Sequence, residues 1–547
     1  MKYKIRFLYL FIFCLVNSPL SQPNENPKLV VGIVIDQMRF DYLYRFRNNY
    51  GSTGFNRLLN EGTNFTYAHF NYVPTYTGPG HASIYTGTVP YYHGIIGNDW
   101  YDKSNAKMIN CTQDAAVKGL GYDNYAGHMS PKKLLTTTIT DQLKSSTNNL
   151  SKVFSVSLKD RASILPGGHS ADAAYWYESE TGRFITSTYY MNQLPDWVIK
   201  FNEKKLPDYY LSKEWDLSKP IEAYYINSPD NAPYEPDLFK EGKTTFPHKF
   251  DNISAKSKYN IFRNTPFGNQ IIVDFVKDIL VNENLGKNIQ TDFLAISFSS
   301  TDYIGHQYGP NSVEVEDTYI KLDEQLSELL SALDKQVGKD NYLLFLTADH
   351  GVDEVPAFLQ KIKIPAGYIN TYIIYDSLKA FSKRKYNNEN LLDNFSNMQF
   401  YLNYKLIKKN KLNSSEILSD FSGYLYTTFD EISLVQTREQ LINLSPERNT
   451  TNLILNGFNI KRSGDLYIEL IPNYISGGVN DRTTHGSIYS YDTHIPLIFY
   501  GWKIPQREIN RPVYIVDIAS TIANLLHITE PDGCIGIPIL EINKSDY

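Results

Sequence analysis

Six side chains with metal-binding chemistry are spread along this sequence: Asp36, Asp302, His306, Asp349, His350 and His485. Carboxylates and neutral imidazoles together are typical ligands of Zn²⁺. Six such ligands suffice for two metal ions, and a pair of ions about 4 Å apart is typical of phosphoryl transfer and related chemistry. The residue types therefore predict a metalloenzyme.

Three of the ligand clusters directly follow continuous apolar runs, at Leu29–Ile35, Phe293–Phe298 and Tyr342–Leu346. Such runs are typical of strands buried on both faces of a parallel sheet, and ligands gather at the carboxyl ends of such strands. Asp302 and His306, four residues apart, would lie on one side of a helical turn. Taken singly, each cluster could be a cap, a turn or a hydrogen-bonded core histidine. Together they predict one shared site.

Thr77, in VPTYTGPGHASIYTG, is the candidate nucleophile. We expect Pro79 at a first helical position and helix-like sequence over His81–Tyr85. A hydroxyl at a helix entry meets positive backbone dipoles that suit a phosphate oxygen, and coordination to Zn²⁺ can hold it as an alkoxide. A helix cap is an equally open interpretation of Thr77.

The alternation of strand-like and helical patterns predicts an α/β fold with a mostly parallel sheet covered on both faces. Further elements are a strand and two helices, expected at Ile495–Tyr500, Val313–Val337 and Val516–Leu526. Two segments, 165–260 and 356–475, break the alternation and are expected to be insertions above the catalytic face. The basic run Tyr404–Lys411 in the second is interpreted as a solvated helix face, with anion binding as the less favoured alternative.

The first 21 residues have the pattern of a secretory signal. Lys2, Lys4 and Arg6 precede the apolar run Phe7–Val16, which is too short to span a bilayer. We therefore expect a mature chain of residues 22–547, exported to the periplasm or the exterior and without stable membrane insertion. Removing residues 1–21 takes away three positive charges and no negative ones, which changes the formal net charge from −6 to −9.

An acidic mature chain argues against nucleic acid as the main partner. The full sequence of 547 residues allows one large catalytic domain with insertions, or two to four domains. After signal removal only Cys111 and Cys534 remain. A disulfide between them and two buried free thiols are both open.

Several long stretches resemble the alkaline phosphatase superfamily and, within it, the secreted bacterial PafA-type alkaline phosphatases. They are VVGIVIDQMRFDYLYR, GIIGNDWYDK, VSLKDRASILPGGH, SSTDYIGH with GPNSVEVEDTY, and THGSIYSYDTHIPLIFYG. The resemblance implies a three-layer sandwich: a mostly parallel central sheet, helices on both faces, and a cap over the catalytic face. It also implies two Zn²⁺ per chain and an enzyme that acts on small phosphate monoesters; we expect a monomer.

The same resemblance divides the ligands between two zinc ions. One ion would take Asp302, His306 and His485; the other would take Asp36, Asp349, His350 and the attacking alkoxide of Thr77. A two-step displacement is implied, in which Thr77 attacks phosphorus and water then releases phosphate.

Asn98, Lys159 and Arg161 match the groups that hold the phosphate oxygens in this family. Two fixed cations favour a monoester dianion over a diester. In isolation, Lys159 and Arg161 would be interpreted as a solvated turn. The alternative function is a phosphodiesterase or nucleotide pyrophosphatase of the same superfamily, with 356–475 as a nucleotide-binding cap. Sulfatase activity is disfavoured because Thr77 cannot form formylglycine, and a non-enzyme would require broken ligands, of which none is missing.

Overall fold

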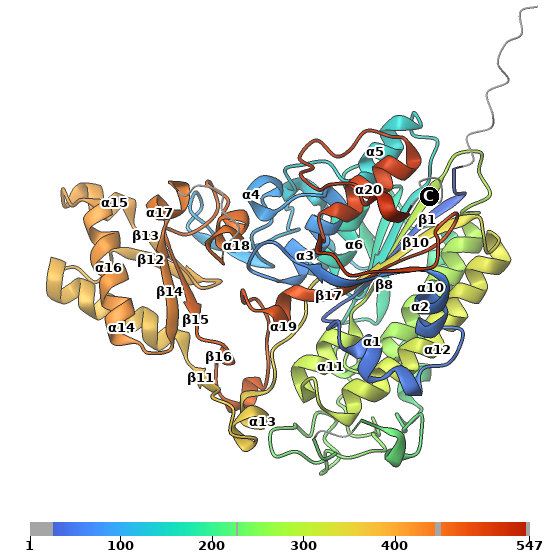
Figure 1. Cartoon of the computed structure of the whole chain (residues 1–547), viewed down its shortest axis with the longest axis horizontal. Coiled ribbons are helices and arrows are strands. Elements are labelled where there is room, and N and C mark those ends of the chain that lie inside the picture. Colours follow the sequence, from blue (N-terminus) through green and yellow to red (C-terminus); the bar gives the residue numbers. More distant parts are fainter. Residues whose placement is uncertain (1–25, 226–227, 444–449, 543–547) are drawn as a thin grey trace, which may run out of the picture.

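The centre of the molecule is a twisted, mostly parallel sheet (Figure 1). The computed structural model describes residues 26–225, 228–443 and 450–542, so the predicted signal at 1–21 lies outside the described residues. The middle strands run parallel in the order β10 (Tyr342–Thr347), β1 (Leu29–Ile35), β9 (Asp292–Phe298), β6 (Val153–Ser157) and β7 (Ala173–Glu178). Every residue of β1, β9 and β10 is buried, as their apolar sequences predict.

On each side the sheet continues with a strand that runs antiparallel to its neighbour in the middle. On one side β17 (His494–Gly501) pairs with β10 and β2 (Thr63–His69), and the short strands β18 (Arg507–Ile509) and β19 (Val513–Tyr514) pair with β2. On the other side β8 (Arg183–Ser187) joins β7 to β5 (Gly119–Leu120). β7 and β8 belong to the sheet although they fall within the segment 165–260 that the sequence suggests as an insertion. The aromatic residues of β7 are buried strand residues, which composition alone did not reveal.

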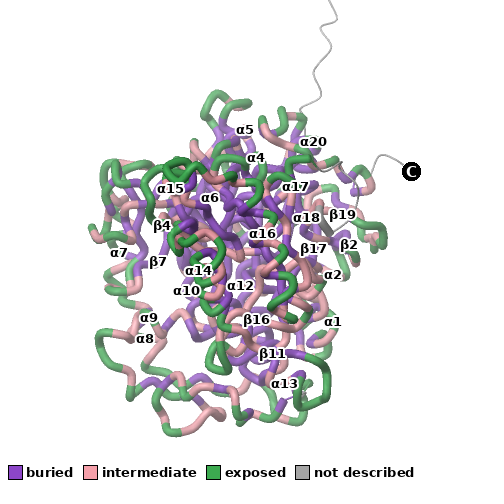
Figure 2. Tube along the Cα trace, turned by 90° about the vertical axis from the view of Figure 1, so that its left-hand side faces the viewer, coloured by how far each residue is buried: buried purple, intermediate pink, exposed green. Residues whose placement is uncertain are grey.

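Helices cover both faces of the sheet, which confirms the predicted three-layer α/β architecture (Figure 1). One face carries α3 (Thr77–Thr86), α5 (Ile139–Ser146), α6 (Asp160–Gly167) and α20 (Asp517–Leu526). The other carries α2 (Phe55–Glu61), α10 (Phe267–Asn282), α11 (Ser300–Tyr308) and α12 (Val313–Gln336). The buried residues run through the middle of the trace in Figure 2. Among the described residues, none of the helices has the length and apolarity needed to traverse a bilayer.

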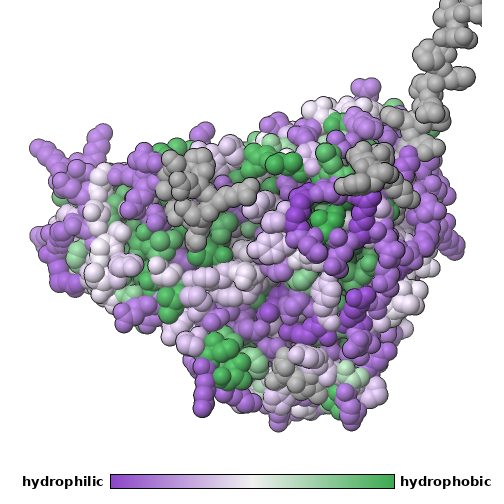
Figure 3. All heavy atoms as spheres, in the orientation of Figure 1, coloured by the Kyte–Doolittle hydropathy of each residue, from purple (hydrophilic) through white to green (hydrophobic). Residues whose placement is uncertain are grey.

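Much of the segment 356–475 forms a lobe beside the catalytic sheet, at the left of Figure 1; we call this lobe the cap. It contains an antiparallel sheet in the order β12 (Leu392–Ser396), β13 (Gln399–Leu402), β15 (Leu466–Leu470) and β14 (Ile432–Thr437). Helices α14 (Thr371–Tyr386) and α16 (Ser414–Thr428) pack on it around a core of their own. In Figure 3 hydrophobic residues show between the hydrophilic edges of the cap.

Candidate active site

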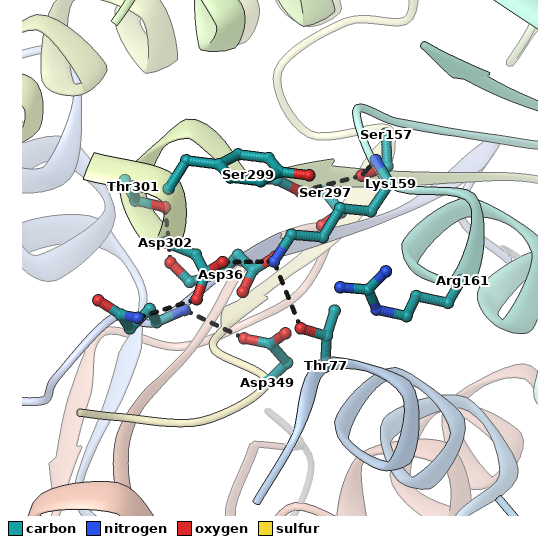
Figure 4. A network of polar contacts seen from close by, with 12 residues as sticks. Asp36, Thr77, Ser157, Lys159, Arg161, Ser297, Ser299, Thr301, Asp302 and Asp349 are labelled. Carbon is teal, nitrogen blue, oxygen red and sulfur yellow. Dashed lines mark hydrogen bonds and ion pairs between the residues drawn. The ribbon is translucent and has the colours of Figure 1, made fainter. Parts of the chain in front are cut away.

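Three strand ends in the middle of the sheet bring three carboxylates together. Asp36 directly follows β1, Asp349 is the second residue after β10, and Asp302 lies in the first turn of α11, which follows β9. Because β1 pairs with both β9 and β10, these ends are neighbours. Figure 4 shows the three carboxylates grouped around one point.

The predicted metal ligands form two overlapping groups in the described part of the chain. Ligand atoms of Asp36, Asp349 and His350 lie within 4.8 Å of one another, and the same holds for Asp302, His350 and His485. His350 thus stands between the two groups. The sequence division had assigned it to one ion only.

His306 joins the second group from α11. Its Nε2 lies 3.1 Å from Asp302 Oδ1, one helical turn away. The D-x-x-x-H spacing therefore places both side chains on one side of the helix, as predicted. All six candidate ligands come together in the structure.

Backbone carbonyls orient all three histidines. The Nδ1 atoms of His306, His350 and His485 donate to the carbonyl oxygens of Thr483, Gly351 and Thr75, at 3.0, 2.9 and 2.7 Å respectively. These bonds fix the tautomer in which Nε2 carries a lone pair. Such an outer hydrogen bond is the usual support of a metal-ligating histidine.

The donor set fits divalent cations. Oδ1 of Asp36, Oδ2 of Asp349 and Nε2 of His350 are buried and make no hydrogen bond, and Asp36 Oδ2 is paired with the ammonium of Lys159 at 2.7 Å. Burial, followed by the charges of Asp302 and Asp349, raises the pKa of Asp36 well above its ordinary value. Carboxylates packed this closely away from water need cations to stay ionised, and mixed nitrogen and carboxylate donors match Zn²⁺.

Thr77 is the first residue of α3, facing the ligands. The helix N-cap is Tyr76, and no side chain caps this end, so Thr77 is not the N-cap. Pro79 is the third helical residue rather than the first, where its missing N–H is still harmless because the first four amides lack helical partners. A Cβ on Gly80 would lie 2.3 Å from the carbonyl oxygen of Asp349, so glycine allows the helix to approach this strand end.

Lys159 reaches the centre of the carboxylate group. Its Nζ lies 2.7 Å from Asp36 Oδ2, 2.6 Å from Asp302 Oδ2 and 3.4 Å from Thr77 Oγ1. Burial alone would lower the pKa of this lysine, but the charges of Asp302 and Asp36 outweigh burial and raise it. The solvated-turn interpretation of Lys159 is therefore wrong.

Arg161 and Asn98 both approach the start of α3. Arg161, on α6, extends its guanidinium toward Thr77 in Figure 4, and its Nε is buried without a hydrogen-bond partner. Asn98 Oδ1 accepts from the amide of Gly78 at 2.7 Å, which holds Asn98 against the start of α3. Lys159 and Arg161 thus direct two cationic groups toward the Thr77 hydroxyl, while Asn98 is fixed at the amide of the next residue.

Three supporting residues were missed in the sequence. Gln37 links both ligand groups. Its backbone N–H donates to Asp349 Oδ1 at 3.1 Å, and its side-chain Nε2 donates to Asp302 Oδ1 at 2.8 Å. His81, one turn after Thr77, donates from Nδ1 to the Thr77 carbonyl at 2.9 Å. In the sequence, the one hint of a role for Gln37 is its position directly after Asp36. For His81 it is the position in the same stretch as Thr77.

Asp492 is the third of these residues and fastens the loop that carries His485. Its Oδ2 accepts from the amides of Gly486 and Ser487 at 3.0 and 2.7 Å and from the Ser487 hydroxyl at 2.6 Å. Both cysteines in the described part of the chain, Cys111 and Cys534, are free. Cys111 lies beside Gly78 and Cys534 beside Gly87, so the disulfide alternative does not hold in this structure.

Comparison with known proteins identifies the family to which this chain belongs. PafA of Elizabethkingia meningoseptica, a named alkaline phosphatase, is 43% identical over 520 residues, which is 94% of each chain. A crystal structure of PafA superposes with a TM-score of 0.91 at 42% identity and covers 94% of this chain and 99% of that one. The chain belongs to the PafA-type alkaline phosphatases.

Two further matches agree with this membership. Residues 30–487 match the family described as type I phosphodiesterase / nucleotide pyrophosphatase. A protein of Myroides odoratus, named a calcium-transporting ATPase, is 44% identical over 525 residues, 95% of each chain. The PafA-type resemblance expected from the sequence is thereby confirmed, together with its fold.

Proposed function

We propose that this PafA-type protein hydrolyses phosphate monoesters with two Zn²⁺ and a phosphothreonine intermediate at Thr77. The observation that carries the proposal is the position of Lys159, whose ammonium lies 3.4 Å from the Thr77 hydroxyl while Arg161 extends toward the same point. Two cations beside the nucleophile match a dianionic phosphoryl group better than a diester monoanion.

The metal ions would be held by the six ligands in two sets. Asp36, Asp349 and His350 would hold one, and Asp302, His306 and His485 the other. When bound, they supply Lewis-acid stabilisation of the attacking and leaving oxygens and lower the pKa of a bound hydroxyl or water.

The protein's own residues position the reaction. Asn98, Lys159 and Arg161 would hold the non-bridging oxygens while Thr77 Oγ forms a bond to phosphorus and the bond to the leaving oxygen breaks. Thr77 gives up its hydroxyl proton to solvent, the departing oxygen takes a proton from solvent, and the alcohol leaves. Water then attacks phosphorus from the side of the lost group, the bond to Thr77 Oγ breaks, Oγ takes up a proton again, and inorganic phosphate is released. The name of the Myroides relative, an ATPase, is compatible with this proposal, because the γ-phosphoryl group of ATP is also a charged terminal phosphoryl group.

A substrate pair tests the monoester assignment. In zinc-loaded Lys159→Ala, kcat/KM for an aryl phosphate monoester should fall about 10- to 150-fold, the loss expected for a hydrogen bond from a charged donor, while that for the aryl methyl diester should fall far less. Lys249→Ala, which removes an exposed lysine paired with Glu214, is the matched control. A diester preference in the native protein would favour the phosphodiesterase alternative. Export and a monomeric state stay predictions from the sequence.

A further inference from the structure

A cavity of about 420 Å³ lies between the cap and the segment that carries the nucleophile. Its walls include Tyr76, Met108, Tyr372, Tyr375, Phe395 and Asn397. The volume falls in the range of about 300–1,000 Å³ that is typical of small-molecule sites. None of the side chains that line it carries a charge.

The cavity borders the candidate active site at two points. Tyr76 immediately precedes Thr77, and its ring lies edge-on to the imidazole of His485 at a centroid distance of 5.6 Å. On the opposite wall, Asn397 Nδ2 donates to the carbonyl oxygen of Asp99 at 2.7 Å, directly beside Asn98. A group attached to a phosphate held at Thr77 can therefore extend into this space.

The chemistry of the walls differs from that of the phosphate site. Tyr375 and Phe395 lie nearly parallel, with an angle of 22° between rings whose centroids are 6.1 Å apart. Tyr372 and Met108 are 67% and 46% exposed at the rim, although both are large hydrophobic side chains. Aromatic faces and a thioether favour a flat aromatic partner and offer no ion pair to an anion.

We propose that this cavity is a leaving-group subsite that binds the planar aromatic part of a phosphate monoester, an aryl ring or a nucleobase. The inference rests on the proposed phosphomonoesterase function and adds the substrate class. Phosphate would stay with Lys159 and Arg161, while the neutral ring packs against Tyr372, Tyr375 and Phe395. The specificity would thus come from the cap rather than from the catalytic sheet.

Matched substrates separate this subsite from the chemistry of the ester bond. Adenosine 5′-monophosphate and ribose 5-phosphate share the same primary alkoxide leaving group and differ by the base. The native protein should show the higher kcat/KM for the nucleotide. Tyr372→Ala should lower kcat/KM for the nucleotide about tenfold, which is the size of one base–aromatic stacking contact. Its kcat/KM for ribose 5-phosphate should not change. For an aryl ring, the loss that Tyr372→Ala causes with phenyl phosphate is compared with the loss it causes with methyl phosphate, because the difference between their leaving groups is the same in both proteins.

Tyr426→Ala is the matched control, since Tyr426 lies on α16 of the cap, is 64% exposed and does not line the cavity. Met108→Ala gives a second variant at the rim, on the opposite side from α14. Calorimetric binding of adenosine supplies a readout that needs no turnover: affinity should fall in Tyr372→Ala and stay unchanged in Tyr426→Ala.

The outcomes are distinguishable. If Tyr372→Ala selectively lowers kcat/KM for the nucleotide or for phenyl phosphate, the subsite is supported, and the substrate that is affected identifies its occupant. Equal losses for the nucleotide and ribose 5-phosphate in every rim variant, with adenosine binding unaltered, would overturn it. Absence of turnover with every monoester would instead refute the proposed function, and adenosine binding would then still decide the nature of the cavity.

Discussion

Replacing Lys159 by alanine should destabilise the metal-free protein much more than the zinc-loaded protein. Its ammonium lies 2.7 and 2.6 Å from Asp36 and Asp302, and the side chain is 2% exposed. The variant leaves these buried carboxylates without their cation, and breaking a buried ion pair from one side costs about 3–5 kcal/mol. Zn²⁺ bound to the same carboxylates would supply the missing positive charge.

The expected shift in the unfolding midpoint follows from the size of the chain. An unfolding entropy of about 2.1 cal/mol/K per residue gives roughly 1.1 kcal/mol/K for 547 residues. A loss of 3–5 kcal/mol therefore lowers Tm by about 3–5 °C in the presence of a chelator. With saturating Zn²⁺ the difference from the native protein should shrink to a small part of that value.

Differential scanning calorimetry with and without Zn²⁺ measures both shifts. Lys144→Ala is the matched control, because Lys144 is also nearly buried, at 7% side-chain exposure, and pairs with Asp172 at 2.9 Å outside the site. Its Tm loss should be the same with and without zinc. If Lys159→Ala behaves like Lys144→Ala, the ammonium does not compensate the metal-binding carboxylates and the reasoning is refuted.

Two further predictions concern the surroundings of the site, and a third concerns a buried carboxyl group elsewhere in the chain. Gly80→Ala should lower kcat by about 10- to 100-fold in a phosphate-release assay, because the new Cβ would lie 2.3 Å from the Asp349 carbonyl oxygen and would displace α3. Gly423→Ala is the control: its Cβ would have open space around it, so kcat should not change. Asp492→Ala should weaken zinc affinity about 10- to 100-fold in a chelator competition, since it frees the loop of one ligand; unchanged affinity would exclude this positioning role. Burial is the main cause that raises the pKa of Glu235 to about 9. The stability contributed by its protonated form is complete below about pH 4.3 and is lost as pH rises toward 9. Between about pH 5 and pH 8.5, the free energy of unfolding measured with urea should therefore fall less in Glu235→Gln than in the native protein.

Much of the scaffold and the metal ligands could be predicted from local sequence. A run such as Leu29–Ile35 is apolar at every position, and that pattern suffices to place a strand buried on both faces. Asp36 follows that run directly, so its place at the sheet edge followed as well. β7 was missed because its tyrosines and tryptophan resemble the composition of the neighbouring loops, although they are buried in the sheet.

Contacts between distant residues could not be predicted without the fold. The direction of Lys159 depends on where α6 packs relative to β1 and α11, and its residue type alone favours a solvated turn. The same holds for Gln37, whose side chain reaches Asp302 across two adjacent strand ends. The cavity beside Tyr76 needs the cap folded against the catalytic sheet, so no local pattern encodes it.

The order of the ligands along the chain has a consequence for how the protein matures. His485 lies beyond the entire cap, whereas Asp36 directly follows the first strand. A nascent chain therefore cannot complete the second ligand group until the cap has been synthesised and has folded back. Binding of the second zinc ion should consequently be a late event in biosynthesis, and a chain interrupted within the cap should retain only the ligand group of Asp36. Full metal occupancy would then report that the whole polypeptide has been made and assembled.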